Sequence, residues 1–214
     1  MSTEKVNQPA YISGFPDGTF KPGKEVTRAE AVRMFVKLVN NGAELPKNPT
    51  TSFKDANNAW YSDEINYAVA KGFIKGYSDG TFKPNQAITR AEFAQMISAF
   101  VKNGYPGTGS FKDVKGHWAS DAISALYGNK NIKGYGDGTF KPDQKLTRAE
   151  AVTILNSVFG RNTKSNSFAN VSEAGLRRFS DVSKSHWAYY EILDASNGHN
   201  AAKIEGMDQV SIWQ

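Results

Sequence analysis

The sequence predicts a mainly α-helical protein built from three similar helix–loop–helix units. Two observations lead to this prediction. A glycine-containing loop motif followed by a helix start occurs three times, and a second motif, which ends in a tryptophan and a helical pattern, alternates with it along the chain. Such repeats are typical of folds in which each unit buries its apolar face against a neighbouring unit.

The first motif, which we call the B half, is a loop followed by a helix start. The loop reads Gly-aromatic-x-Asp-Gly-Thr-Phe-Lys-Pro at residues 14–22, 76–84 and 134–142, and Thr-Arg-Ala-Glu follows at 27–30, 89–92 and 147–150. Threonine and glutamate at this spacing form a capping box, in which each side chain bonds the backbone N–H of the other. Apolar residues then recur every three or four positions, among them Phe35, Phe100 and Leu155, which predicts a largely buried amphipathic helix.

The second motif, the A half, begins with Phe-x-Asp and continues to a tryptophan. Its aspartates are Asp55, Asp113 and Asp181. Apolar residues after each tryptophan have helical spacing, so we expect a second helix with the aspartate as its N-cap.

The spacing between the halves predicts how they pair. Trp60 to Gly76 and Trp118 to Gly134 are both 16 positions apart, whereas the connections from a B half to the next A half vary in length. A constant spacing indicates a packed unit, and a variable spacing indicates surface loops. We therefore expect one 1–214 module, in which the C-terminal A half at 179–197 completes the N-terminal B half at 11–41. The other predicted units are 53–103 and 111–160, followed by an irregular excursion at 161–178 and a tail of unassigned fold at 198–214.

Composition narrows the classes of partner. A net charge of +5 favours an anionic partner, but the absence of a Lys/Arg-rich run argues against nucleic acid. No stretch approaches the roughly 18 apolar residues of a membrane helix, so membrane insertion is not expected. The first residues do not read as a signal peptide, so an exported protein would carry this chain as a fragment or a processed form.

No residue pattern indicates catalysis, a metal or a cofactor. His117 and His186 occupy the same repeat position, and Ala59 takes it in the remaining copy, so we expect structural histidines and no catalytic residue. The chain has no cysteine, which excludes thiolate metal sites. The Asp-Gly-Thr turns are too short for an EF-hand loop.

The arginine of the Thr-Arg-Ala-Glu motif is not explained by helix capping. A cation in the first helical turn faces the positive end of the helix dipole, at a cost of a few tenths to about 1 kcal/mol. Arg28, Arg90 and Arg148 nevertheless all occupy this position. Two explanations stay open. Each arginine latches onto a carboxylate of a neighbouring unit, or it binds an external anion together with free helix N–H groups and the nearby lysine. Those lysines are Lys21, Lys83 and Lys141.

The tryptophans of the A halves have two interpretations. Trp60, Trp118 and Trp187 each precede a predicted helix and face a B loop. Tryptophan in such a place is usually part of the core, which is our expectation. The alternative is an aromatic face that stacks on a sugar ring.

Together these motifs resemble the S-layer homology (SLH) family over residues 11–197. The residues that carry the resemblance are Phe-x-Asp-Val-x-x-x-His-Trp-Ala, Gly-Tyr-x-Asp-Gly-Thr-Phe-Lys-Pro and Thr-Arg-Ala-Glu. The resemblance implies a pseudo-threefold, three-pronged helical bundle, and we expect the module to be a monomer. It implies non-covalent anchoring of an extracellular protein to the cell wall or S-layer of a bacterium, mainly of the Gram-positive type. The implied ligand is an acidic secondary cell-wall polysaccharide, often with pyruvate ketals on N-acetylmannosamine.

The resemblance also implies site residues, in grooves between adjacent prongs. The motif arginines Arg28, Arg90 and Arg148 would contact a pyruvyl carboxylate. The implied neighbours are Gly14, Gly76, Gly134, Asp17, Asp79, Asp137, Lys21, Lys83, Lys141, Trp60, Trp118 and Trp187. A lattice-forming protein–protein module, with the arginines as latches, is the alternative.

The chain departs from the family pattern in three places. It opens with a B half, where the family usually opens with an A half. Ala59 replaces the usual histidine before Trp60, which puts the affinity of the groove beside that tryptophan in doubt. Phe15 stands where the other two loops have tyrosine, so one groove lacks a phenol hydroxyl.

Overall fold

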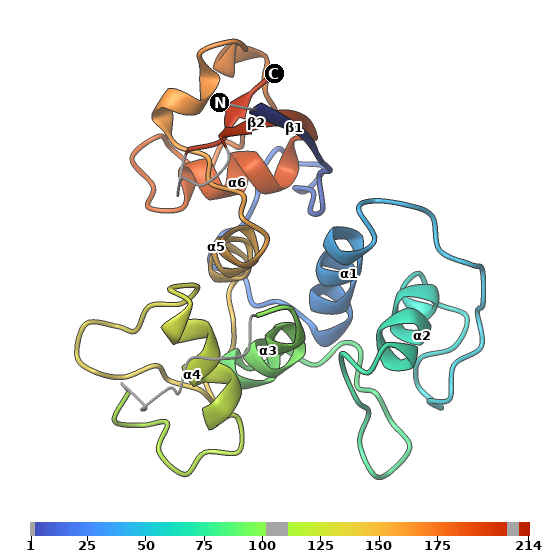
Figure 1. Cartoon of the computed structure of the whole chain (residues 1–214). Coiled ribbons are helices and arrows are strands. Elements are labelled where there is room, and N and C mark those ends of the chain that lie inside the picture. Colours follow the sequence, from blue (N-terminus) through green and yellow to red (C-terminus); the bar gives the residue numbers. More distant parts are fainter. Residues whose placement is uncertain (1–2, 102–110, 205–209) are drawn as a thin grey trace. The chain divides into compact units, whose positions relative to one another are not determined.

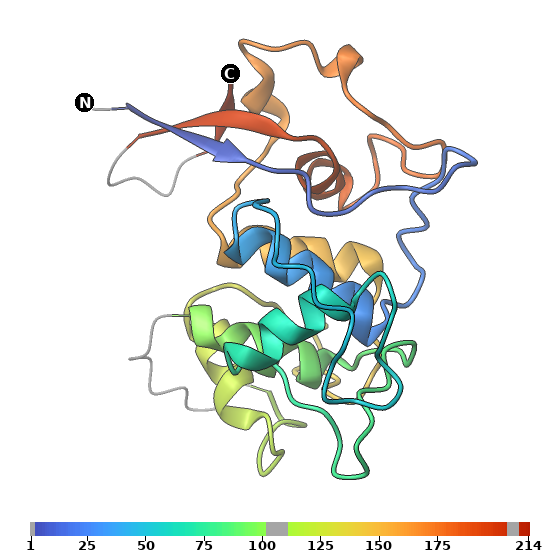
Figure 2. The ribbon, with the colours of Figure 1, turned by 90° about the vertical axis from the view of Figure 1, so that its right-hand side faces the viewer.

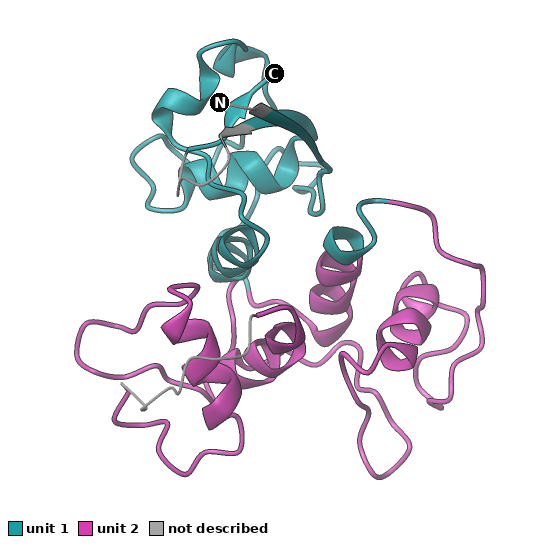
Figure 3. Cartoon of the chain, viewed as in Figure 1, with its two compact units in different colours: residues 1–24, 37–42, 148–214 teal, residues 25–36, 43–147 magenta. Residues whose placement is uncertain are grey.

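The computed structural model describes residues 3–101, 111–204 and 210–214. Within these residues the chain forms six α-helices, three short 3-10 helices and one three-stranded sheet (Figure 1). The expectation of a mainly α-helical protein is therefore confirmed, while the threefold arrangement stays a prediction. The chain divides into two compact units (Figure 3). Unit 1 comprises Met1–Lys24, Lys37–Gly42 and Arg148–Gln214, and unit 2 comprises Glu25–Val36 and Ala43–Thr147.

The B-half helices begin where the capping boxes place them. They are α1 (Arg28–Val39), α3 (Arg90–Ile97) and α5 (Arg148–Val158). At α3 the Thr89 hydroxyl accepts from the N–H of Glu92 at 3.0 Å, and the Glu92 carboxylate accepts from the N–H of Thr89 at 3.3 Å. The capping box predicted there is thus confirmed.

Helix α3 is shorter than the apolar pattern predicts. A 3-10 helix, η1 (Ser98–Phe100), follows it, and the Phe100 side chain is 40% exposed. Its ring still packs edge-on against Phe35, with 5.2 Å between the ring centroids. The tighter 3-10 turn changes the direction in which residue 100 points, so this member of the apolar stripe is not buried as predicted.

The A-half helices begin later than expected. They are α2 (Ser62–Ala70), α4 (Ser120–Gly128) and α6 (Tyr189–Ser196), and none has a side-chain hydrogen bond at its N-cap residue. The prediction that aspartate caps these helices is wrong. The carboxylate of Asp55 instead accepts from the backbone N–H groups of Phe82 and Lys83 at 2.8 and 2.9 Å. Asp113 and Asp181 make the same pair of bonds to their own loops, so this residue joins an A half to a B loop.

The first phenylalanine of each A half packs on the phenylalanine of a B loop. The ring centroids lie 5.3 Å apart for Phe53 and Phe82, and 5.4 Å apart for Phe111 and Phe140. In unit 1 the corresponding pair is Phe179 and Phe20, at 5.2 Å. This last contact supports the predicted pairing of the C-terminal A half with the N-terminal B half. The unit boundaries remain a prediction, and residues 102–103 lie outside the described part of the chain.

Unit 1 also contains a sheet that the sequence did not indicate. Strands β1 (Thr3–Gln8), β2 (His199–Ile204) and β3 (Ile212–Trp213) form an antiparallel sheet in that order (Figure 2). Gln8 pairs with His199, so the two ends of the described chain lie side by side. The predicted tail is therefore an integral part of unit 1.

The predicted excursion at 161–178 is irregular but firmly anchored at its start. It contains the 3-10 helices η2 (Ser165–Phe168) and η3 (Glu173–Gly175). Arg161 is 2% exposed, and its Nε donates to the Asp194 carboxylate at 2.5 Å. A buried arginine needs such partners, because an unpaired charge in the interior is costly.

Candidate functional site

Each B loop is a tight turn held by its own aspartate and threonine. The Asp17 carboxylate accepts from the hydroxyl of Thr19 at 2.6 Å and from its N–H at 3.0 Å. Asp79 with Thr81 and Asp137 with Thr139 repeat this arrangement. These hydrogen bonds lower the pKa of each aspartate, the bond from the threonine hydroxyl most of all. The predicted site aspartates therefore shape the loop.

The first glycine of each B loop makes room for a phenylalanine ring. A Cβ at Gly14 would overlap the ring of Phe179, and a Cβ at Gly76 or Gly134 would overlap Phe53 or Phe111. Close packing of the two halves thus explains these three predicted site residues without a ligand.

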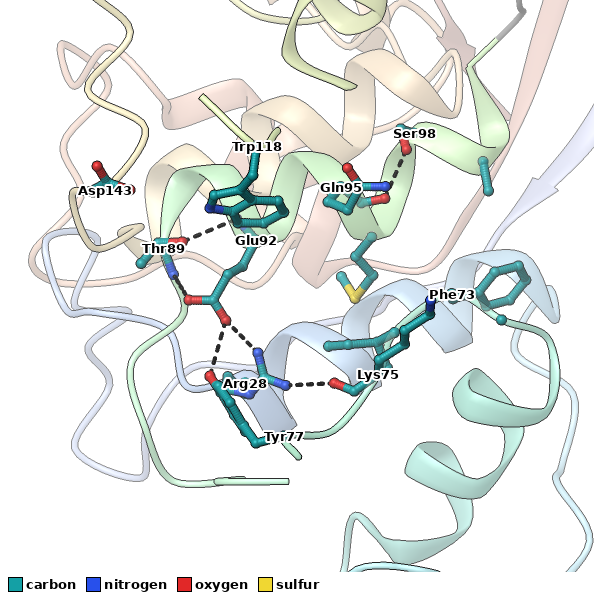
Figure 4. A pocket seen from close by; sticks show the side chains of 14 residues that line it. Arg28, Phe73, Lys75, Tyr77, Thr89, Glu92, Gln95, Ser98, Trp118 and Asp143 are labelled. Atoms are coloured by element: carbon teal, nitrogen blue, oxygen red, sulfur yellow. Dashed lines mark hydrogen bonds and ion pairs between the residues drawn. The ribbon is translucent and has the colours of Figure 1, made fainter. Parts of the chain in front are cut away.

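The Arg28 side chain joins three elements of unit 2. It is 4% exposed. Its Nε donates to the carbonyl of Phe82 at 2.9 Å, and its Nη2 donates to the carbonyl of Lys75 at 3.1 Å. Nη1 pairs with the Glu92 carboxylate, and the guanidinium lies 4.8 Å from the centre of the Tyr77 ring (Figure 4). Arg28 therefore connects α1 to the second loop and to α3.

The other two motif arginines make the same central contact. Arg90 donates from Nε to the carbonyl of Phe140 at 2.8 Å, and Arg148 donates to the carbonyl of Phe20 at 2.8 Å. Their side chains are 5% and 6% exposed. Each arginine thus bonds the backbone carbonyl of the loop phenylalanine of a different repeat. The carboxylate partner that the latch interpretation names is seen at Arg28, which pairs with Glu92.

The helix N-termini are not open to an anion. In α1 the N–H of Arg28 donates to the carbonyl of Gln86 at 2.9 Å, and the N–H of Ala29 donates to the carbonyl of Pro84 at 3.0 Å. The N–H of Glu30 donates to the Thr27 hydroxyl at 3.1 Å. The chain that follows the second loop lies across this first turn, and equivalent bonds occur at α3 and α5. The prediction that free N–H groups hold an anion here is therefore wrong.

The B-loop lysines lie on the aromatic residue of their own loop. The Lys83 ammonium is 4.1 Å from the centre of the Tyr77 ring, and the ammonium groups of Lys21 and Lys141 are at 4.3 and 4.2 Å from Phe15 and Tyr135. Arg28 contacts the same tyrosine. The loop aromatic, which we had singled out only for its missing hydroxyl, thus lies against two cations. The fixed six-residue spacing between aromatic and lysine was the signal for this contact.

The three A-half tryptophans are on the surface. Trp60, Trp118 and Trp187 are 52%, 63% and 65% exposed. The prediction that they belong to the core is wrong, because the next residue takes the inward position. Ala119, for example, is fully buried.

One pocket in unit 2 brings several of these residues together. Its volume is about 760 Å³, within the range of small-molecule sites. Arg28, Trp118 and Asp143 lie toward one end with Thr89, and Phe73 and Ser98 lie toward the other (Figure 4). Burial raises the pKa of the Tyr77 hydroxyl, which also lines the pocket. Of the predicted site residues described in unit 2, only Arg28 and Trp118 line it.

The pocket wall carries balanced charge. Its cationic residues are Arg28 and Lys75, and its carboxylates are Glu92 and Asp143. Glu92 belongs to the Thr-Arg-Ala-Glu motif, but the sequence explained it by helix capping alone. Lys75 and Asp143 were not predicted as site residues, because no repeated motif marks them. Within the described residues no group of three or more His, Cys, Asp or Glu side chains is arranged to hold a metal ion. No helix in the described ranges is long and apolar enough to cross a membrane.

A comparison with protein families settles which family the repeats represent. The model of the S-layer homology domain matches residues 10–32, 52–94 and 110–152, just over half of the chain. This chain belongs to the S-layer homology domain family. The three matched segments contain all three motif arginines, Arg28, Arg90 and Arg148.

Curated proteins with similar sequences come from bacteria. A protein named cell surface glycoprotein 1 from Acetivibrio thermocellus is 35% identical over 89% of the SLH chain and 8% of its own length. A cellulosome-anchoring protein from the same species is 34% identical over 94% of the chain and 45% of its own length. An S-layer protein of Bacillus licheniformis is 35% identical over 67% of the chain and 17% of its own length. The SLH chain therefore spans less than half the length of these relatives.

Proposed function

We propose that this chain is a monomeric, non-catalytic module that anchors a bacterial surface protein to the cell wall. It does so by binding an acidic secondary wall polysaccharide in pockets such as the one lined by Arg28 and Trp118. The observation that carries the proposal is the repeated exposed tryptophan. Three copies of the repeat keep a large aromatic side chain on the surface at the same position, with exposures of 52–65%.

An aromatic face of this kind suits a carbohydrate. Leaving a tryptophan in water forgoes the burial of 150–250 Å² of surface, so three such residues need a reason outside the core. Trp118 shares its pocket with the polar side chains of Gln95 and Thr89, which can bond sugar hydroxyls. An apolar ring beside a few polar groups is the usual make-up of a small-molecule site.

A carboxylate on the glycan supplies the anionic part of the proposal. The contacts in the described part of the chain engage three of the five N–H groups of Arg28, which leaves two for a ligand. The Glu92 carboxylate already holds one edge of the guanidinium. A single carboxylate, such as a pyruvate ketal, fits this arrangement better than a densely charged polyanion.

The names of the relatives support the proposed location at the bacterial cell surface. One of them is named a cellulosome-anchoring protein and another an S-layer protein, and we propose by analogy that this chain acts at the cell surface. We extend the proposed contacts to the equivalent residues of all three repeats, with Arg28, Arg90, Arg148, Trp60, Trp118 and Trp187 as the central ones. The loop residues contribute by holding the loop in shape.

The test is binding of the full chain to purified wall polysaccharide, before and after acid removal of its pyruvyl groups. We expect Trp118→Ala to weaken binding about tenfold, because stacking on an indole contributes on the order of 1 kcal/mol or more. The matched control is Tyr127→Ala, which removes an aromatic that is 43% exposed on the same helix, α4, and does not line the pocket. Equal affinities of wild type and Trp118→Ala would contradict the sugar-stacking role.

Assembly into a protein lattice is the second candidate. The observation that favours it is the burial of all three arginines in contacts between repeats, as a structural latch requires. A lattice module associates with itself without glycan. Sedimentation at increasing protein concentration separates the two candidates, since a glycan-binding monomer stays monomeric until polysaccharide is added.

A further inference from the structure

A histidine and an aspartate form a fixed pair at the rim of the unit 2 pocket. His117 Nδ1 accepts from the backbone N–H of Ala119 at 3.1 Å. The proton of a neutral ring therefore sits on Nε2, which lies 2.9 Å from Asp143 Oδ1 and donates to it. The histidine side chain is 14% exposed, whereas the aspartate side chain is 81% exposed. A mostly buried, oriented group thus holds a mostly exposed carboxylate.

The Asp143 carboxylate has acceptor capacity to spare. One hydrogen bond from His117 uses one of about four lone-pair directions on its two oxygens. Asp143 and Trp118 line the same pocket, and the His117 and Trp118 rings are neighbours with centroids 5.5 Å apart. A sugar stacked on Trp118 would therefore present its hydroxyls to a carboxylate whose position is already fixed. Such pre-organisation lowers the entropy cost of binding.

Only one of the three repeats combines a histidine before the tryptophan with an aspartate after the loop proline. After the loop proline the three repeats carry Gly23, Asn85 and Asp143, and before the tryptophan they carry Ala59, His117 and His186. His117 alone of these has an acidic partner in the described structure. The pair therefore distinguishes this pocket from any site formed by the other copies.

We infer that Asp143, positioned by His117, is a sugar-binding residue that accepts hydrogen bonds from the hydroxyls of the glycan unit stacked on Trp118. This inference rests on the proposed function and extends it to specificity. With two cations and two carboxylates, the pocket wall has no net charge to attract a polyanion. The pocket selects a glycan with free hydroxyls and sparse carboxylates over a polyphosphate such as poly(glycerol phosphate).

The test compares the full wild-type chain with Asp143→Asn by calorimetric titration. The probes are the purified wall polysaccharide, the same polymer stripped of pyruvyl groups, and poly(glycerol phosphate). Asp121→Asn is the matched control, because it makes the same charge change at an exposed residue of α4 that does not line the pocket. We expect Asp143→Asn to weaken binding of both polysaccharide forms about tenfold, as expected for loss of a hydrogen bond to a charged acceptor.

The outcomes separate the inference from the proposed function. If wild type and Asp143→Asn bind the polysaccharide equally, the inference fails and the proposed function stands. If the substitution tightens binding of the pyruvylated polymer, Asp143 only repels anions and the inference also fails. Absence of binding by the wild type overturns both. Preference of the wild type for poly(glycerol phosphate) overturns the proposed specificity.

The role of His117 has its own readout. A positioning residue acts only through Asp143, so His117→Gln combined with Asp143→Asn weakens binding no more than Asp143→Asn alone. In addition, ¹⁵N spectra of the imidazole should show the Nε2–H tautomer in both proteins, since Ala119 keeps Nδ1 unprotonated, and a shifted Nε2 resonance in Asp143→Asn, since its acceptor has lost the charge. Additive losses of affinity would show that His117 does not act through Asp143.

Discussion

The Arg28 side chain connects the first turn of α1 to two other segments of unit 2. The guanidinium bonds two backbone carbonyls and the Glu92 carboxylate while almost fully buried. The sequence predicted that this arginine needs a partner and could not say which one. The partner residues lie 47 to 64 positions away, and only the folded chain brings them together.

The first prediction concerns this latch. We expect Arg28→Ala to lower the free energy of unfolding by about 3–5 kcal/mol, because it leaves the half-buried Glu92 carboxylate and two carbonyls without their donor. Arg33→Ala is the control. The Arg33 side chain is 45% exposed and its Nε lies 3.8 Å from the Glu64 carboxylate, and such a surface ion pair contributes at most about 1 kcal/mol to stability. Chemical denaturation measures both variants. Similar losses for the two would contradict the latch.

The second prediction concerns the first glycine of the loop. Gly14→Ala places a methyl group against the Phe179 ring and the Thr19 carbonyl, so we expect a loss of stability of about 1–3 kcal/mol. Gly23→Ala is the matched control in the same unit, because a Cβ there meets no atom within 4 Å. Thermal unfolding should shift for the first variant alone. An unshifted Gly14→Ala would show that the ring moves away freely.

The positions around Trp118 were predicted only in part from the sequence. Helical spacing after Trp118 was correct, since Ile123 and Leu126 are fully buried. The start of the helix was placed too early, and helix ends are the least certain part of any such prediction. Asp113 was expected as the N-cap, whereas α4 begins at Ser120, so Trp118 precedes the helix and is not part of its buried face.

At the scale of elements, the contact between α5 and α6 carries a titratable group. Asn156 on α5 donates to the Glu191 carboxylate on α6 at 2.7 Å. Burial raises the pKa of Glu191 from its ordinary 4.5 to about 7. Burial has the opposite effect on His199 of strand β2, whose pKa it lowers.

The third prediction follows from the Glu191 pKa. Between pH 4.5 and about 7 the folded chain binds more protons at this carboxyl than the unfolded chain does. The stability contributed by this carboxyl is therefore fully present below pH 4.5 and is lost as pH rises to about 7, by about 3 kcal/mol. Urea titrations across this range measure the slope.

Glu191→Gln isolates this contribution from the others. The amide keeps an acceptor for Asn156 but does not titrate, so the decline should be smaller in the variant. His199 changes stability in the opposite direction, since its depressed pKa lowers stability as pH falls below about 6.5, and the difference between the two proteins removes it. Identical pH profiles would contradict the assignment to Glu191.

The sequence predicted the α-helices but not the β-sheet. All three B helices and all three A helices were expected, because period and capping are local properties of the sequence. The sheet was missed because β1 and β2 pair residues that are far apart, and β3 has only two residues. Trp213 is nevertheless 1% exposed and donates to Thr163 at 3.0 Å.

At the scale of the whole molecule, repetition made the family predictable before the fold was known. The match of the family model to three segments confirms the resemblance. Internal repeats also explain the errors, because a misplaced residue in one copy is misplaced in all three. Features that belong to a single copy, such as the His117–Asp143 pair, carry no repeat signal and emerged only from the structure.

The proposal of one glycan site per repeat also bears on affinity for a polymer. Once one site holds the glycan, the others meet further units of the same strand at high effective concentration. Single substitutions should therefore be compared on short fragments of the glycan, where the contribution of one pocket is not masked.

The pairing of β1 with β2 has a consequence for how the chain folds as it is made. Gln8 is synthesised long before His199, its partner in the sheet, so it cannot form this pair until His199 has been made. The packing of the Phe20 ring on Phe179 is delayed in the same way. Contacts that close such long loops form late, and the segments that await them stay exposed. The sequence of unit 2, which lies within residues 25–147, is available before that of the second half of unit 1, so we expect the N-terminal segment of the nascent chain to stay unpaired until residues 148–204 have been made.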